Sequence, residues 1–147
     1  MNRDWIFTYN QGTFLGASHE LYRITGEKSY LDDAVHAADY VINRMSNNNG
    51  VLSNATSGDG GLFHGIFFRY FVKLINEKDL NMDTRRKFHS YLTHLATVMA
   101  ENGINHNSML YGGDWWQAPA DKQNVGLTPH LTGCMLMEAM CVLETLE

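Results

Sequence analysis

The sequence predicts an all-α fold in which antiparallel helical hairpins are stacked side by side. Apolar residues recur at intervals of three and four along most of the chain, which is the spacing of amphipathic helices. Strongly apolar segments also alternate with segments that have one polar face, as expected where inner helices alternate with outer helices. The length of 147 residues suits one domain with one core.

The first two predicted helices are joined by a short turn. Residues 12–25 form the first helix, and Gly26 ends it. Ser29 and Asp32 resemble a capping box at the start of the second helix. The predicted apolar stripes are Phe14, Ala17, Leu21 and Ile24 in the first helix, and Leu31, Ala34, Val35, Ala38, Val41, Ile42 and Met45 in the second.

A polar loop precedes the third predicted helix. Residues 47–61 are rich in Asn, Ser, Gly and Thr, and Val51-Leu52 is expected to be a short extended piece. Residues 62–75 carry apolar side chains on nearly every side, which predicts an inner helix that is buried all round.

The fourth and fifth helices are separated by a long loop. Asp83 is the expected N-cap of the fourth helix, and the apolar stripe of this helix is Phe88, Tyr91, Leu92, Leu95, Val98 and Met99. Asn102-Gly103 ends it, and residues 104–126 form a loop whose length indicates function or disorder. Thr128-Pro129 is the expected start of the last helix, as N-cap and first helical residue.

The loops that precede the inner helices are expected to share one rim of the fold. Antiparallel neighbours make all the inner helices point the same way. The pattern Gly-x-Phe-x-Gly occurs at 12–16 and again at 61–65, each time near the start of an inner helix. A ligand is therefore expected at this rim.

The composition excludes several classes of partner and cofactor. The formal charge is −5 and no run of Lys or Arg occurs, which argues against nucleic acid and acidic membranes. No apolar segment approaches the roughly 18 residues that cross a bilayer. No zinc-ligand spacing, phosphate loop or dinucleotide motif occurs, so we expect no metal and no cofactor. Cys134 and Cys141 are expected to be small core residues that are too far apart to form a disulfide.

Three segments of the chain form a recognisable set: Trp5-Ile6-Phe7-Thr8-Tyr9-Asn10-Gln11-Gly12-Thr13-Phe14-Leu15-Gly16, Tyr30-Leu31 with Ala34, and Gly65-Ile66-Phe67-Phe68-Arg69-Tyr70. Together they resemble glycoside hydrolase family 76, whose members act on α-1,6-linked mannan. The resemblance implies an (α/α)6 toroid, of which residues 1–147 would form one partial domain, just under half and from the C-terminal part. Met1 would then be a cloning start, and Leu146-Glu147 a vector remnant.

The resemblance also implies that the catalytic residues lie elsewhere. The family uses adjacent aspartates among tryptophans in its N-terminal part, as nucleophile and acid/base. Asp32-Asp33 is the adjacent aspartate pair of this sequence, but no Trp flanks it and we assign it to helix capping. We therefore expect that this chain alone does not hydrolyse mannan. The resemblance suggests an extracytoplasmic setting.

Candidate sugar-binding residues occur near the starts of two inner helices. Tyr9, Asn10 and Gln11 offer an aromatic face and two amides, although the amides could instead cap the helix. His64 stands where the family often has lysine, and it serves either as a donor to a hydroxyl or as an internally bonded histidine. Arg69 is expected to pair with a buried carboxylate.

The long loop supplies the strongest local candidate. Indole rings stack on the C–H face of sugars, and the sequence Asp114-Trp115-Trp116-Gln117 places two of them beside a carboxylate and an amide. We expect one Trp to anchor the loop and the other to contact sugar.

Two other functions agree with the helical pattern. One is another (α/α)6 sugar enzyme, such as an epimerase or an unsaturated-uronide hydrolase. The other is a non-catalytic carbohydrate-binding or scaffold module. A partial toroid would also expose an apolar wall, which predicts self-association.

Overall fold

The computed structural model describes residues 5–143, and most of these residues are helical. The expectations for Met1 as a cloning start and for Leu146-Glu147 as a vector remnant lie outside the described residues. The α-helices are α1 (Thr8–Thr25), α2 (Lys28–Tyr40), α3 (Phe63–Ile75), α4 (Met82–Val98) and α5 (Leu127–Val142). Three short helical segments are η1 (Val41–Met45), η2 (Gly58–Leu62) and η3 (Met99–Gly103). The strands β1 (Ile104–Asn105) and β2 (Leu110–Tyr111) pair antiparallel.

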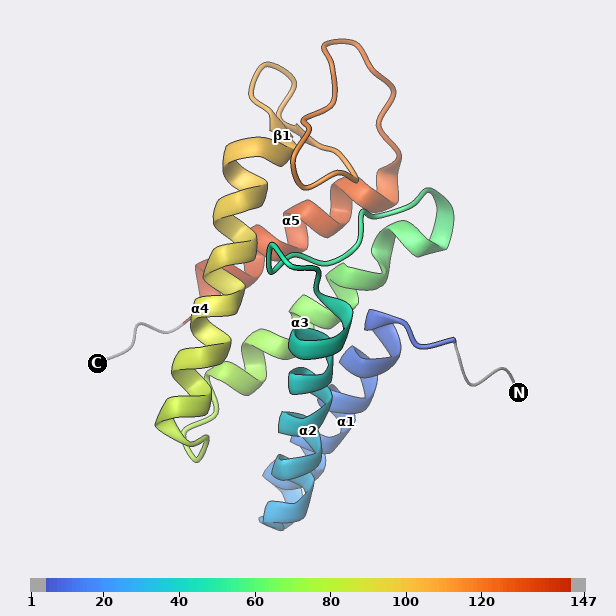
Figure 1. Ribbon diagram of the computed structural model, residues 1–147. Coiled ribbons are helices and arrows are strands. Elements are labelled where there is room, and N and C mark those ends of the chain that lie inside the picture. The colour runs from blue at the N-terminus through green and yellow to red at the C-terminus, as the bar shows by residue number, and fades with distance from the viewer. Residues whose placement is uncertain (1–4, 144–147) are drawn as a thin grey trace.

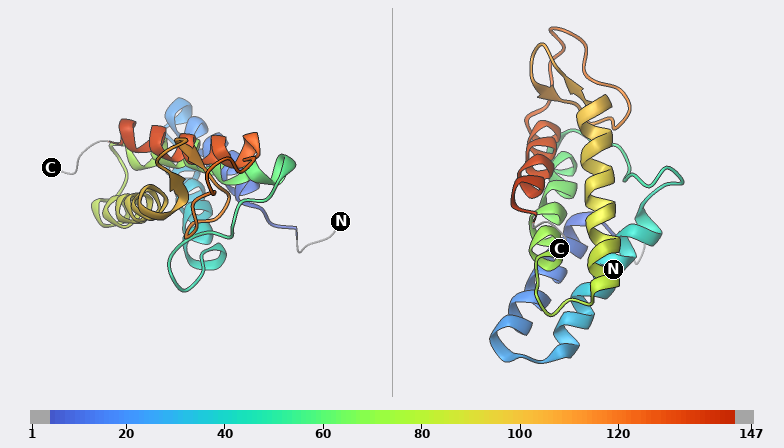
Figure 2. Two further views of the ribbon diagram at one scale, coloured as in Figure 1. Left: turned by 90° about the horizontal axis from the view of Figure 1, so that it is seen from above. Right: turned by 90° about the vertical axis from the view of Figure 1, so that its left-hand side faces the viewer.

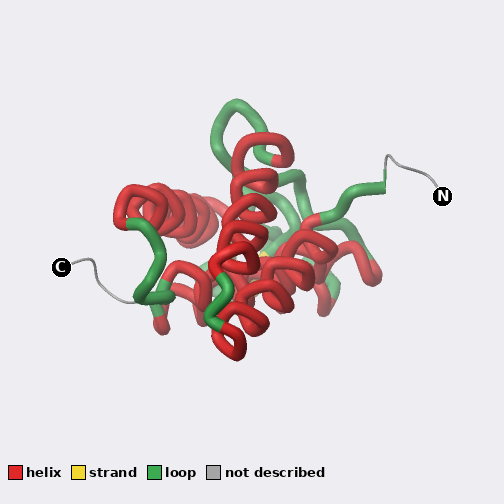
Figure 3. The backbone as a smooth tube through the Cα atoms, turned by 90° about the horizontal axis from the view of Figure 1, so that it is seen from below, coloured by secondary structure: helices red, strands yellow, loops and turns green. Residues whose placement is uncertain are grey.

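The helices form two layers, as the sequence predicted. The inner layer contains α1, α3 and α5, which pack in this order, and α2 and α4 lie together on one side of it (Figures 1 and 2). Seen from below, helices make up most of the backbone, and loops join the helix ends (Figure 3). The inner helices run in the same general direction, so their N-terminal ends face the same side of the molecule.

The hydrophobic core lies between the two layers and is centred on α3. Phe67, Phe68 and Phe71 are fully buried there, and the ring centroids of Phe71 and Phe88 of α4 are 5.2 Å apart. The prediction that α3 is buried all round was wrong, because Arg69 and Lys73 are exposed on its other side. The predicted apolar stripe of α4 is confirmed, and all six of its residues are buried.

The repeated Gly-x-Phe-x-Gly pattern brings neighbouring inner helices close together. A Cβ at Gly12 would lie 2.6 Å from Cα of Phe67, so α1 and α3 touch through their backbones. In the second copy, a Cβ at Gly65 would lie 2.7 Å from Sδ of Met135 in α5. The repeat therefore joins α1 to α3 and α3 to α5.

The predicted apolar stripe of α1 is on the solvent side, which corrects the sequence interpretation. Phe14 is 53% exposed, Leu21 is 42% exposed and Ile24 is 80% exposed. The buried side of α1 instead carries residues that include Gly12, Gly16, Ser18 and His19. Close packing against α3 requires the small residues, and it turns the apolar stripe away from the core.

Four helices start at other residues than predicted. The turn between α1 and α2 contains Gly26 in the left-handed conformation, and the Thr25 hydroxyl accepts a hydrogen bond from the Glu27 N–H. Helix α2 begins directly after Glu27, and neither Ser29 nor Asp32 caps it. Asn81, not Asp83, caps α4, because its side chain accepts from the N–H groups of Asp83 and Thr84.

Thr128 does not cap α5, because Gly126 is the N-cap and the Thr128 hydroxyl donates to the Gly58 carbonyl instead. Similarly, α1 begins at Thr8, which places Tyr9, Asn10 and Gln11 in its first turn and not before it.

The two cysteines are not core residues, contrary to the prediction. Both thiols are free; Cys141 is exposed and Cys134 is half-buried. They lie on the side of α5 that also carries exposed Leu131 and Glu138. Of the other minor predictions, Val51 and Leu52 are buried but do not form a strand.

Among the described helices, none combines the length and the apolar character needed to cross a membrane. Within residues 5–143, no group of three His, Cys, Asp or Glu side chains is arranged to hold a metal ion.

Candidate functional site

The N-terminal ends of α1, α3 and α5 meet two loops, residues 47–57 and 112–126, and we call this region the rim. The loops are joined by a backbone hydrogen bond of 2.7 Å from the Ala55 N–H to the Gly113 carbonyl. Thr128 of α5 donates to the Gly58 carbonyl at 2.6 Å, which ties the start of α5 to the segment before α3. The predicted convergence of the three inner-helix starts is therefore confirmed.

His64 holds the centre of the rim together. It is buried, with Nδ1 2.8 Å from the Thr8 hydroxyl and Nε2 2.9 Å from the Ser53 carbonyl. A carbonyl only accepts, so Nε2 carries the hydrogen and Nδ1 accepts from Thr8. Burial lowers the pKa of His64, and the hydrogen bond to Ser53 opposes this in part. Both ring nitrogens are thus engaged within the protein, which is the internally bonded alternative considered from the sequence.

The two tryptophans of the long loop differ in their surroundings. Trp115 is fully buried and its Nε1–H donates to the Ser53 carbonyl at 3.3 Å, so it anchors the loop. Trp116 is 49% exposed. Asp114 accepts from the Trp116 N–H at 2.8 Å and from Nδ2 of Asn54 at 2.8 Å, which fixes the start of the loop against residues 47–57. The expected loop anchor is therefore Trp115, and the sugar contact expected of the other Trp stays a prediction.

Aromatic side chains line the rim at the start of α1. The Tyr9 and Phe63 ring centroids are 4.5 Å apart, those of Phe7 and Phe63 are 5.2 Å apart, and those of Trp5 and Phe7 are 6.4 Å apart. Trp5 is 70% exposed. This row of rings continues from the interior of the rim to the solvent, and it provides apolar faces of the kind that sugars stack on.

A cavity of about 200 Å³ lies beside these rings, and we call it the rim cavity. The polar side chains around it come from Thr8, Ser53, Asn54, Thr56 and His64. Its apolar lining comes from Ile6, Phe7, Met45 and Phe63. A small cavity with apolar faces and a few hydroxyl and amide groups suits a neutral polar ligand.

The structure brings some of the predicted site residues together. His64 and Trp115 share the Ser53 carbonyl, while Tyr9 reaches the same region through Phe63. Asn10 is exposed and Gln11 is half-buried in the first turn of α1.

Sequence reasoning missed Thr8, Ser53 and Asn54, which join the rim elements. Ser53 and Asn54 lie in the loop that the sequence marked only as polar. Their spacing gives no helical or strand pattern, so composition alone could not single them out.

The remaining predicted residues do not belong to the rim. Arg69 is exposed on α3, and the structure gives it no ion pair within residues 5–143, so its predicted buried carboxylate partner was wrong. Asp32 and Asp33 are exposed on α2, near the end of α1 that is opposite the rim.

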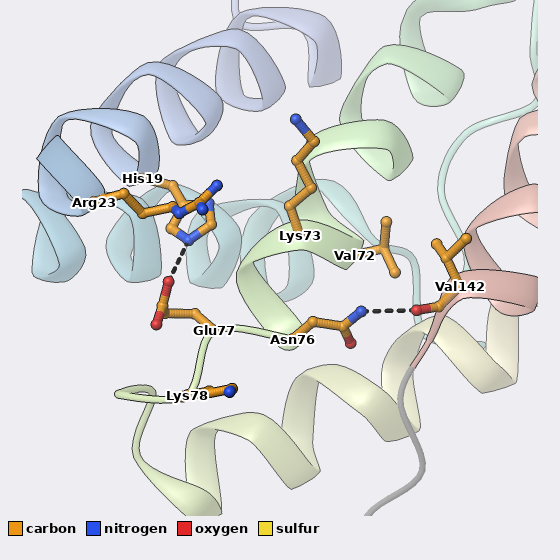
Figure 4. Close-up of a pocket in the computed structure, with 8 residues that line it drawn as sticks. All are labelled: His19, Arg23, Val72, Lys73, Asn76, Glu77, Lys78 and Val142. Carbon is orange, nitrogen blue, oxygen red and sulfur yellow. Dashed lines mark hydrogen bonds and ion pairs between the residues drawn. The ribbon is translucent and has the colours of Figure 1, made fainter.

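A larger open cavity of about 450 Å³ lies at that opposite end, near the C-terminal ends of the inner helices (Figure 4). Its lining residues are His19, Arg23, Val72, Lys73, Asn76, Glu77, Lys78 and Val142. Nε2 of His19 is 2.9 Å from Oε2 of Glu77, and Nδ2 of Asn76 donates to the Val142 carbonyl at 2.7 Å.

Burial opposes the charged form of Glu77, but hydrogen bonds from His19 and from the backbone hold its pKa below the ordinary value. These contacts tie helix ends together, and no Phe, Tyr or Trp is among the lining residues of this cavity. We therefore place the candidate site at the rim.

Comparisons with known proteins identify the family and the fold of the chain. The model of the family described as glycosyl hydrolase family 76 matches residues 2–146. The GH76A alpha-1,6-mannanase of Salegentibacter sp. HEL1_6 is 42% identical with a TM-score of 0.90, over 97% of this chain and 42% of that chain. The Lin0763 protein of Listeria innocua is 31% identical with a TM-score of 0.82, over 95% of this chain and 38% of that chain. No curated protein matches the chain.

An inactive variant of the Salegentibacter enzyme, with two aspartates replaced by alanine, was solved in complex with alpha-1,6-mannotetrose. It is 43% identical to this chain, with the same coverage of 97% and 42%. The chain thus spans well under half the length of these solved structures, and it corresponds to part of an (α/α)6 fold. The epimerase and uronide hydrolase alternatives fall away, because the chain belongs to glycosyl hydrolase family 76.

Proposed function

We propose that this chain supplies one wall of a glycan-binding cleft for α-1,6-linked mannan, and that the rim is this wall. The observation that carries the proposal is the 43% identity over 97% of the chain to an enzyme that binds alpha-1,6-mannotetrose. The rim adds suitable chemistry, because exposed aromatic faces lie beside a cavity lined by hydroxyl and amide groups.

The proposed contacts with sugar come from Tyr9, Asn10, Gln11 and Trp116. The exposed Trp116 indole stacks on a sugar ring, and the amides of Asn10 and Gln11 bind hydroxyl pairs. His64, Asp114 and Trp115 belong to the same site and hold its loops in place through the hydrogen bonds described above.

We also propose that the nucleophile and acid/base of the parent enzyme lie outside these 147 residues. The inactive relative lacks two aspartates, and the adjacent pair in this sequence, Asp32-Asp33, lies on a second-layer helix away from the rim. Glycosidic cleavage needs two carboxyl groups on either side of the scissile bond, and the rim offers Asp114 alone among the predicted site residues.

The test is to incubate the 147-residue chain with α-1,6-mannotetraose and to measure both binding and hydrolysis. We expect binding without turnover. Trp116→Ala should weaken binding about tenfold, since an aromatic contact contributes roughly 0.5–1.5 kcal/mol beyond its buried area. Met109→Ala is the matched control, because Met109 is also an exposed apolar residue, 61% exposed, in the turn between β1 and β2.

Clear turnover of the glycan by this chain would overturn the assignment of the catalytic pair to another part of the protein. An unchanged affinity in Trp116→Ala would remove that indole from the site. No detectable binding by the chain would contradict the proposal that the rim binds glycan on its own.

A further inference from the structure

A second cavity lies within the long loop, and we call it the loop pocket. It has a volume of about 280 Å³ and lies between residues 112–126 and the first turn of α5. The polar side chains that line it are Asp114, Gln117, Gln123 and Asn124. Asp114 and Gln117 belong to the motif that the sequence singled out, whereas Gln123 and Asn124 lie in irregular backbone and carried no sequence signal.

The walls of the loop pocket are held by hydrogen bonds inside the loop. The Gly112 N–H donates to the Gly103 carbonyl at 3.0 Å, and Nδ2 of Asn105 donates to the Pro119 carbonyl at 2.8 Å. The backbone N–H of Ala120, which follows Pro119, donates to Oε1 of Gln123 at 2.8 Å. A pocket whose walls are already fixed loses little conformational freedom when a ligand enters.

The chemistry of the loop pocket suits a neutral ligand that carries several hydroxyl groups. Gln117 and Asn124 are exposed, and the amide nitrogen of Gln123 is still a donor when its oxygen accepts from Ala120. Each amide offers donor and acceptor groups, which match neighbouring hydroxyls. Pro119 and Pro129 give the cavity an apolar side, and Asp114 is the charged residue of its lining.

The size of the pocket limits what it holds. Its volume of about 280 Å³ is below the range of roughly 300–1,000 Å³ that is usual for drug-sized ligands. One sugar ring is therefore a better match than an oligosaccharide.

The loop pocket is joined to the rim cavity by one hydrogen bond. Asp114 lines the loop pocket, Asn54 lines the rim cavity, and Oδ2 of Asp114 accepts from Nδ2 of Asn54 at 2.8 Å. We propose that the loop pocket is a second subsite, which binds one neutral hexose unit of a glycan whose other units lie along the rim. This inference rests on the proposed function, because it extends the same cleft.

The experiment compares two variants of the full 147-residue chain in the binding of α-1,6-mannotetraose. The double variant Gln117→Ala/Asn124→Ala should lose about tenfold in affinity, since each hydrogen bond contributes roughly 0.5–1.5 kcal/mol. Asn43→Ala is the control, because Asn43 is an exposed asparagine of η1, outside the rim, and lines neither cavity. Its affinity should equal that of the wild type.

Backbone and side-chain amide NMR signals locate the bound sugar in the same titration. We expect shifts at Gln117 and Asn124 as well as at Asn54. If tetraose binds with shifts at Asn54 alone and the double variant keeps its affinity, the second subsite is wrong while the proposed function stands. If the wild-type chain does not bind tetraose at all, both proposals fail together.

Discussion

The hydroxyl of Thr8 lies 2.8 Å from Nδ1 of His64, and this contact joins the first residue of α1 to the first turn of α3. The other nitrogen of the same ring donates to the Ser53 carbonyl, so one buried side chain connects two inner helices and the loop between α2 and α3. Because the carbonyl fixes which nitrogen carries the hydrogen, Thr8 must be the donor to Nδ1. The shape of the rim depends on this neutral histidine.

Removing the Thr8 hydroxyl should destabilise the fold. In Thr8→Val the shape of the side chain is kept, but Nδ1 of His64 loses its donor inside the protein. An unsatisfied buried acceptor costs about 1–3 kcal/mol, and urea unfolding should show a loss of this size. Thr13→Val is the control, since Thr13 is exposed on the same helix, and it should change the stability by no more than about 0.5 kcal/mol. An equal loss in both variants would contradict the role given to the Thr8–His64 contact.

The lowered pKa of His64 makes the stability depend on pH in a defined direction. In the unfolded chain this histidine has its ordinary pKa of 6.5, while in the folded protein burial lowers the pKa. Below about pH 6.5 the unfolded state therefore binds more protons than the folded state, and the free energy of unfolding decreases as the pH falls. The loss continues down to the folded-state pKa.

The check is to compare the wild type with His64→Gln by urea unfolding at about pH 7.5 and about pH 5.5. Glutamine keeps a donor for the Ser53 carbonyl but does not titrate. The wild type should lose more stability between the two pH values than the variant does. Equal losses would show that His64 does not contribute to the pH dependence.

Adding a methyl group at Gly12 should separate α1 from α3. The new Cβ would lie 2.6 Å from Cα of Phe67, which is backbone and cannot rotate away. Overpacking of this kind costs about 1–3 kcal/mol, although alanine is otherwise the better helix former. Ala17→Gly is the reverse control on the exposed side of α1, and it should cost about 0.5–1 kcal/mol through helix propensity alone. A stabilised Gly12→Ala variant would contradict the close contact.

The layers of the fold could be predicted from the sequence, because helical spacing and short turns determine which helices are neighbours. The stripe of α4 shows this, since every predicted residue is buried. The stripe of α1 could not be assigned correctly from spacing. Gly12 and Gly16 contribute little to an apolar pattern, but the space they leave decides which side of α1 meets α3.

The parts of the candidate site that consist of distinctive side chains could be predicted from the sequence. The parts that consist of backbone carbonyl groups could not. Trp115 and Trp116 are adjacent, and the sequence indicated one loop anchor and one sugar contact without showing which is which. The Ser53 carbonyl, which accepts from both His64 and Trp115, carries no sequence signal at all, because every residue has a carbonyl group. The start of α5 after Gly126 was likewise set by backbone geometry, because no side chain caps it.

The exposed stripe of α1 leads to a last prediction, that the 147-residue chain associates with a second copy of itself. Phe14, Leu21 and Ile24 are 53%, 42% and 80% exposed and lie on one side of one helix. The chain spans 42% of the length of the Salegentibacter enzyme, and within the described residues these three side chains stay open to solvent. Two apolar stripes that meet remove each other from water.

Sedimentation velocity over a range of concentrations measures this association. The wild type should form dimers or larger species, and Leu21→Glu/Ile24→Glu should shift the profile to monomer because it places charges in the contact. Met82→Glu is the control: Met82 is 43% exposed at the start of α4 and does not belong to the α1 stripe, so a charge there should leave the association unchanged. A monomeric wild type that binds no apolar dye would show that the stripe does not drive association, whereas an equal effect of both substitutions would point to net charge as the cause.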